Sequence, residues 1–210
     1  MEPFKFEVRN MGVHFCLPII AFLIVLTFLL LLPPETYILQ QFLLIQVLVI
    51  PLSAWCTVFL VYELYHNHAE EILIPFYRNK LFINYAKIIV IFIFMLTSLS
   101  MVLGMKAEGL DFVELCLLFT SQTLVISSFS LLAAVFFKSV EISLMIVIMY
   151  VATEVITMGD VMPWPHLFYF NLDLVVHEIE LYGTISLVST IIFIILTRSL
   201  VKTIERNMIF

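Results

Sequence analysis

The sequence predicts an all-α, polytopic membrane protein with six transmembrane helices. Of its 210 residues, 63% are hydrophobic and only 12% are charged, whereas soluble domains carry about 25% charged residues. The apolar residues continue through nearly the whole chain, in runs close to the roughly 20 residues that a helix needs to cross a bilayer. A soluble fold could not bury so much apolar surface, so most of the chain has the membrane as its solvent.

The apolar runs give the positions of the six expected spans. They lie at about 13–32, 38–62, 84–104, 113–137, 142–158 and 181–201. The first run is longer than the roughly 7–15 apolar residues of a signal peptide, so we interpret it as a retained helix. No long-period repeat, linker or low-complexity tract divides the sequence. We therefore expect one transmembrane domain over residues 1–210.

The distribution of basic residues predicts the orientation. Six crossings place both termini on one side of the membrane. If that side is the cytoplasm, nine of the ten Lys and Arg residues lie inside and only Lys106 lies outside. Cytoplasmic loops carry an excess of Lys and Arg. We therefore expect cytoplasmic N- and C-termini.

Several classes of function lack their sequence signatures. No P-loop motif occurs among the five glycines, so no ATP site is expected in this chain. Cys16, Cys56 and Cys116 form no C-x-x-C pair, and His66 and Glu70 lack further matched ligands, so we expect no metal site. The net charge of −6 and the lack of a basic stripe argue against a nucleic-acid partner. We expect no catalytic residues and no enzymatic activity in this chain.

The inner loop between the second and third spans is the most informative segment. Residues 69–74 predict a short helix with Glu70 and Glu71 near its positive N-terminal end. Pro75 is expected to end this helix, and Arg78 and Lys80 follow it. The result would be a compact charged element projecting into the cytoplasm. The alternative is an ordinary solvated connector whose charges only follow the positive-inside rule.

This loop has an acidic, apolar, Pro-x-x-Arg, then Lys pattern. It is formed by Glu63, Glu70 or Glu71, Ile72, Leu73, Pro75, Arg78 and Lys87. With its six spans, the chain resembles the type-2 permease family of ATP-binding-cassette (ABC) transporters, although it lacks the Gly-Thr that usually precedes the acidic residue. The resemblance implies a cytoplasmic coupling helix that docks on an ATPase subunit through Glu70, Glu71, Ile72, Leu73, Pro75, Phe76 and Arg78.

A second landmark of the same family lies between the fifth and sixth spans. There the resemblance implies a re-entrant extracellular segment of short helices, and residues 158–170 look like such a segment. The residues assigned to it are Asp160, Pro163, Trp164 and Pro165. An aromatic belt at the outer interface is the alternative interpretation.

Polar residues inside the second and fifth spans are candidates for a substrate pathway. They are Gln46, Ser53, Thr57, Tyr150, Glu154 and Thr157. The first three share a helix face, although helix packing explains them about as well. Glu154 is costly in lipid unless it faces water, protein or a partner, and Tyr150 and Thr157 share its face. Its alternative role is to reach the outer interface by snorkelling.

Together these features predict a permease subunit of an ABC exporter that moves an amphipathic or lipophilic cargo, such as a peptide, drug or lipid. The resemblance implies a separate ATPase subunit that binds ATP and Mg²⁺, and a second permease copy or homologue in a homo- or heterodimer. It also implies a multi-pass protein of a bacterial plasma membrane. The alternatives are a membrane protein that sequesters a peptide or anchors a partner without transport, and the substrate-binding membrane subunit of a vitamin importer.

Overall fold

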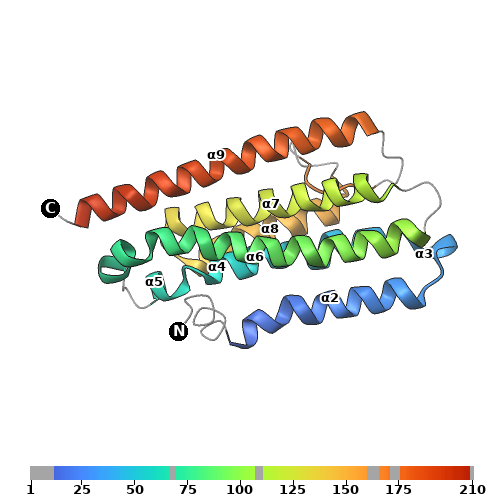
Figure 1. Ribbon diagram of the computed structural model, residues 1–210, viewed down its shortest axis with the longest axis horizontal. Coiled ribbons are helices and arrows are strands. Elements are labelled where there is room, and N and C mark those ends of the chain that lie inside the picture. The colour runs from blue at the N-terminus through green and yellow to red at the C-terminus, as the bar shows by residue number, and fades with distance from the viewer. Residues whose placement is uncertain (1–11, 67–69, 107–110, 160–165, 171–175, 209–210) are drawn as a thin grey trace.

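The computed structural model describes residues 12–66, 70–106, 111–159, 166–170 and 176–208, and the fold is all-α. The elements are α2 (Val13–Leu31), α3 (Pro34–Leu44), the π-helical turn η1 (Ile45–Val49), α4 (Pro51–Phe59), α5 (Tyr62–His66), α6 (Glu70–Lys106), α7 (Phe112–Phe137), α8 (Val140–Thr157) and α9 (Val176–Met208). The long helices run lengthwise through an elongated bundle. In it, α2 begins and α9 ends at the same end (Figure 1).

Six helical segments are long and apolar enough to cross a membrane, as the sequence predicts. They are His14–Leu31, Thr36–Phe59, Asn79–Lys106, Phe112–Phe137, Val140–Thr157 and Leu181–Arg206. The chain is therefore a multi-pass membrane protein. The last helix is longer than the expected span 181–201, since α9 begins at Val176 and ends at Met208.

The second span differs from the uninterrupted helix expected over 38–62. It consists of α3, η1 and α4, and the N–H of Ile50 donates to the carbonyl of Ile45 at 3.2 Å, the i to i+5 pattern of a π-helix. Pro51 follows directly and has no N–H to continue the α-helical ladder. The π turn shifts the helix face locally at Gln46, and single π turns of this kind often lie at functional sites.

The inner loop also differs from the prediction. Pro75 does not end a short helix over 69–74, because α6 runs without a break from Glu70 to Lys106. Pro75 lies only in the second turn of this 37-residue helix. Its missing N–H removes one intrahelical hydrogen bond there, and the long remainder supplies the others. The expected coupling element is thus the start of α6 rather than a separate helix.

The centre of the bundle is α7, which packs against α4, α6, α8 and α9. Two apolar clusters fill the interior. One lies toward the end with α5 and includes Leu81 and Val135, and the other lies toward α3 and includes Phe42 and Phe119. In contrast, only 22% of the residues in the spans of α2, α8 and α9 are buried. These three helices therefore present apolar surface to the lipid.

The C-terminal end of α2 is closed by side chains from two neighbouring helices. The ammonium group of Lys106, the last residue of α6, donates to the carbonyls of Leu29 at 2.6 Å and Leu30 at 3.0 Å. The amide of Gln41 donates to the Leu32 carbonyl at 3.2 Å. These carbonyls have no partner within α2, so a cation here satisfies them and interacts favourably with the helix dipole.

We expect Lys106→Met to lower the free energy of unfolding by about 1–3 kcal/mol, because it leaves partly buried carbonyls without a donor. Unfolding in mixed micelles with increasing sodium dodecyl sulfate measures this change. Lys202→Met is the matched control, since Lys202 is exposed near the end of α9. Equal stability of the two variants would contradict the capping role of Lys106.

Candidate functional site

Residues 166–170, between α8 and α9, return into the helix bundle without forming a helix. Leu167 is 4% exposed and Phe168 is 3% exposed, and both belong to the apolar cluster that includes Phe119. Non-helical backbone at membrane depth is tolerated only where protein or water satisfies its polar groups. The partners of this segment are therefore the first place to look for a function.

The end of α8 directs the chain back toward this segment. Met158 adopts a left-handed conformation with φ 49°, and the N–H of Gly159 donates to the Glu154 carbonyl at 3.0 Å. This is the i to i+5 bond that closes a helix end. Gly159 has φ 86°, and a Cβ there would lie 3.1 Å from Nδ1 of His166. The left-handed φ therefore favours glycine at this turn, and a larger residue would also crowd the ring of His166.

Glu154 receives the returning segment. Its side chain is fully buried, and its Oε1 accepts hydrogen bonds from the backbone N–H groups of Leu167 and Phe168, the latter at 2.9 Å. Within the residues that the structure describes, Oε2 has no hydrogen bond of standard geometry, although the carboxyl group interacts with the phenol of Tyr150. Snorkelling to the interface is therefore wrong, because Glu154 points inward and binds backbone.

Two glutamines and a tyrosine complete the set of contacts. The Gln46 amide pairs with Tyr169, accepting from its N–H at 3.0 Å and donating to its carbonyl at 2.9 Å. The Gln122 amide donates to Oε1 of Gln46 at 2.7 Å and to the Leu167 carbonyl at 2.6 Å. The Tyr182 hydroxyl donates to the same carbonyl at 3.0 Å. We call Gln46, Gln122, Glu154 and Tyr182 the polar clamp.

The polar clamp joins four elements, η1, α7, α8 and α9, around one short stretch of backbone. Gln46, Gln122 and Glu154 are each completely buried. Oε1 of Gln122 has no hydrogen-bond partner in the described part of the chain. The clamp thus fixes the segment and still holds a buried oxygen able to accept a further hydrogen bond.

The structure brings together only half of the six predicted pathway residues. Gln46, Tyr150 and Glu154 meet at residues 166–170. Ser53 and Thr57 are buried but donate to carbonyls of their own helix span, those of Ile50 and Ser53. Thr157 does not support Glu154, because its hydroxyl donates to the Thr153 carbonyl at 2.7 Å. A Ser or Thr hydroxyl in a helix usually finds this local acceptor first.

Sequence reasoning missed Gln122 and Tyr182. Gln122 had a usable signal, because an uncharged amide in the middle of an apolar span must find a partner inside the protein. The same span carries a small-residue stripe typical of a packing face, which hides that signal; it is formed by Thr120, Thr123, Ser127 and Ser130. Tyr182 begins the sixth span, where tyrosine is common as an interfacial residue, so nothing distinguished it.

An apolar cavity of about 240 Å³ adjoins the polar clamp. Its floor is formed by α7, and its sides by α8, α9 and the loop residue Leu167. The lining residues are Val125, Ile126, Phe129, Val147, Tyr150, Leu167 and Phe193. Because the Leu167 carbonyl is held by Gln122 and Tyr182, the clamp also positions one wall of this cavity.

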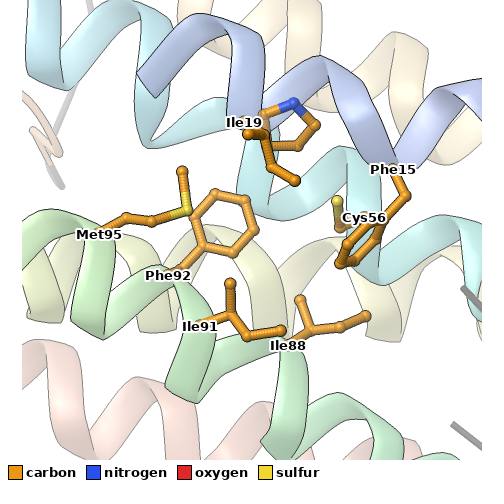
Figure 2. Close-up of a pocket in the computed structure, with 8 residues that line it drawn as sticks. Phe15, Ile19, Cys56, Ile88, Ile91, Phe92 and Met95 are labelled. Atoms are coloured by element: carbon orange, nitrogen blue, oxygen red, sulfur yellow. The ribbon is translucent and has the colours of Figure 1, made fainter. Parts of the chain in front are cut away.

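A second cavity, between α2, α4 and α6, is too small for a ligand. Phe15 and Ile19 of α2, Cys56 of α4, and Phe92 and Met95 of α6 point toward one another around it (Figure 2). Its volume is about 10 Å³, near the limit for a single water, and its apolar lining offers a water too few partners. We interpret it as imperfect packing beside Pro18, which lies inside α2.

The other predicted sites lie outside what the structure describes. The outer residues Asp160, Pro163, Trp164 and Pro165 fall between the described ranges, as does residue 69 of the inner loop. For residues 70–78 the structure describes the helical backbone of α6 but not the side chains. Among the described residues, no group of three or more His, Cys, Asp or Glu side chains could hold a metal ion.

We expect Glu154→Leu to speed hydrogen exchange of the Leu167 and Phe168 amides by about tenfold or more, because two buried N–H groups lose their acceptor at roughly 1–3 kcal/mol each. Exchange followed by mass spectrometry of the peptide covering 166–170 measures this. Glu154→Gln keeps an acceptor oxygen and should exchange near the wild-type rate. Unchanged protection in Glu154→Leu would contradict the role of the carboxyl group as the anchor of this segment.

Comparison of the chain with models of known protein families, with curated proteins and with solved structures finds no match. A function must therefore be argued from the residues and geometry of the chain itself.

Proposed function

We propose that this chain is the permease subunit of an ABC exporter that moves an amphipathic or lipophilic cargo outward. The observation that carries the proposal is the length of α6, which has 37 residues, of which only Asn79–Lys106 form the apolar span. A helix of this length measures about 55 Å, whereas the hydrocarbon core of a bilayer is about 30 Å thick. The start of α6 therefore extends beyond the lipid.

This extension and the first two residues of the span, 70–80 in all, form a continuous helical arm suited to a soluble partner. It carries Glu70, Glu71, Arg78 and Lys80, and it lies with α5 at the end of the bundle where α9 terminates (Figure 1). A coupling element must transmit force between an ATPase and the spans. One continuous helix does this better than a jointed loop, because a shift at its tip moves the span directly.

The orientation follows from the basic residues. The end that holds the arm also holds the turn between α7 and α8, which contains Lys138, and the last turns of α9, which contain Lys202 and Arg206, whereas α6 ends with Lys106 at the opposite end. Excess Lys and Arg favours the cytoplasmic side. We infer cytoplasmic termini, a cytoplasmic arm in place of a separate coupling helix, and an outer position for residues 158–175.

The polar clamp supports a pathway role for Glu154. A carboxyl group fully buried among apolar spans is costly to keep unless it has a function. Glu154 lies next to the loop between the fifth and sixth spans, where that loop enters the bundle. We infer that Glu154 and Gln46 hold the loop closed over the outer end of the pathway. The segment containing Asp160, Pro163, Trp164 and Pro165 would form its re-entrant outer part.

Energy would come from a separate ATPase subunit that binds ATP and Mg²⁺, since this chain carries no P-loop motif. A second permease copy or homologue would complete the pathway, and the exposed apolar faces of α2, α8 and α9 offer surfaces for it. The abundance of Phe, Leu and Met suits an amphipathic or lipophilic cargo.

Gentle purification from the native membrane tests the proposal. We expect a P-loop ATPase to co-purify in stoichiometric amount, detected by mass spectrometry, and the complex to turn over ATP. The double variant Glu70→Lys with Glu71→Lys should insert normally but lose most of the ATPase, because two attractive charges on the arm become repulsive. Recovery of the intact chain without an ATPase would instead favour a membrane protein that sequesters a peptide or anchors a partner.

Glu141→Lys is the control for the arm variant. Glu141 is an exposed acid in the first turn of α8, on the same side of the membrane as the arm but on another helix. It should retain the ATPase at the wild-type level. Undiminished co-purification by the double arm variant would argue against residues 70–80 as the docking site.

A pathway role of the carboxyl group itself, beyond the hydrogen bonds that glutamine can also accept, predicts that Glu154→Gln slows transport while the complex assembles normally. In proteoliposomes of the complex, we expect ATP-driven movement of a fluorescently labelled phospholipid to slow by about tenfold, the equivalent of about 1.4 kcal/mol in the barrier. Glu141→Gln, an exposed acid on the same helix, should move the probe at the wild-type rate. Equal rates for all three proteins would end the pathway role of Glu154.

A further inference from the structure

We infer that the 240 Å³ cavity between α7, α8 and α9 is a binding site for the acyl chain of a bilayer lipid. The inference concerns lipid bound to this chain alone, and it stands whether or not the chain transports. It needs no ATPase and no second copy, so its test and the test of the exporter proposal can fail separately.

The packing of the helices leaves this cavity open toward the lipid. Both α8 and α9 pack on α7 but hardly contact each other. Phe129 and Val125 of α7, Tyr150 of α8 and Phe193 of α9 are each only partly buried, whereas Val147 behind them is 5% exposed. The cavity is therefore a slot between α8 and α9 with α7 as its floor.

The depth of the slot matches the hydrocarbon core. Val147 lies near the middle of the span Val140–Thr157, and Phe193 near the middle of Leu181–Arg206. Phe129 lies just past the middle of α7. At this depth the bilayer supplies acyl chains rather than headgroups or water. The surfaces of α8 and α9 beside the slot are also apolar, with Ile148 at 58% and Ile191 at 56% exposure.

The lining selects for an apolar occupant. Its side chains are Val, Ile, Leu and Phe with one Tyr, and the neighbouring carboxyl group of Glu154 accepts from backbone rather than facing the slot. A dry cavity of roughly 150 Å³ with such a lining accepts a small apolar molecule. The larger slot can hold a longer apolar segment, and an unoccupied slot would forfeit the contacts of all its lining atoms.

Leu167 links this site to the polar clamp. It forms a wall of the slot while its N–H is held by Glu154 and its carbonyl by Gln122 and Tyr182. A chain seated in the slot would therefore pack against the re-entering segment 166–170. Lipid occupancy should accordingly add to the protection of that segment.

Photolabelling tests the site. The purified chain is reconstituted in phosphatidylcholine vesicles containing a trace of phosphatidylcholine with a diazirine near the end of one acyl chain, and adducts are mapped by mass spectrometry after irradiation. We expect adducts on Phe129 and Phe193 in excess of those on exposed positions of the same helices, such as Leu117 and Leu187. Labelling of the slot at or below that background would overturn the site. A slot that is covered by a second copy of the chain would give this result.

A matched pair of variants sharpens the result. Val147→Phe fills the slot and should reduce labelling of Phe193 to the background of exposed positions. Ile148→Phe adds similar bulk to the neighbouring lipid-facing position and should leave the labelling unchanged. Retention of excess labelling in a Val147→Phe protein that elutes as wild type in size exclusion would overturn the site. If that variant does not fold, the map of adducts on the wild-type chain alone tests the site.

Discussion

The structure depends on one constraint, that backbone polar groups inside a bilayer must find partners within the protein. The helices meet this requirement by themselves. Residues 166–170 do not, and the polar clamp meets it for them: the Glu154 carboxyl group accepts from two N–H groups, and the Gln46 and Gln122 amides donate to neighbouring carbonyls. Without Gln46, Gln122, Glu154 and Tyr182, this segment could not remain between the spans. The arrangement of η1, α7, α8 and α9 around it follows from this need.

The same constraint explains the smaller irregularities of the fold. The π turn η1 precedes Pro51 and carries Gln46, so the break in the helical ladder occurs where a side chain reaches Tyr169. At the other irregular point, the end of α2, Lys106 supplies the missing donor from a neighbouring helix. At the end of α2, Lys106 and Gln41 satisfy carbonyls that the helix leaves unpaired, whereas the side chain carried by the π turn satisfies backbone of residues 166–170.

The two ends of the bundle differ, and the proposed permease function would use both. At one end the start of α6 extends beyond the apolar span as a charged arm. At the other end a buried polar network holds a non-helical segment beside an apolar slot that faces lipid. A rigid helix, α6, connects the arm to the end where Lys106 caps α2. In the proposed permease, force applied to the arm would reach the half of the bundle around Lys106 through packed helices rather than through a flexible loop.

The sequence by itself determined the number, order and approximate limits of the six spans. The length of an apolar run is a local property of the sequence, and it can be compared directly with the number of residues needed to cross the bilayer. It also identified Glu154 as unusual, because a lone carboxyl in an apolar span is visible without any structure. Only the tertiary structure decided what Glu154 does there, and that Gln122 and Tyr182 share the task. Their partners lie 13 to 76 residues away along the chain, and no local pattern specifies which helices become neighbours. The continuation of α6 through Pro75 likewise depends on the length of the helix that follows it.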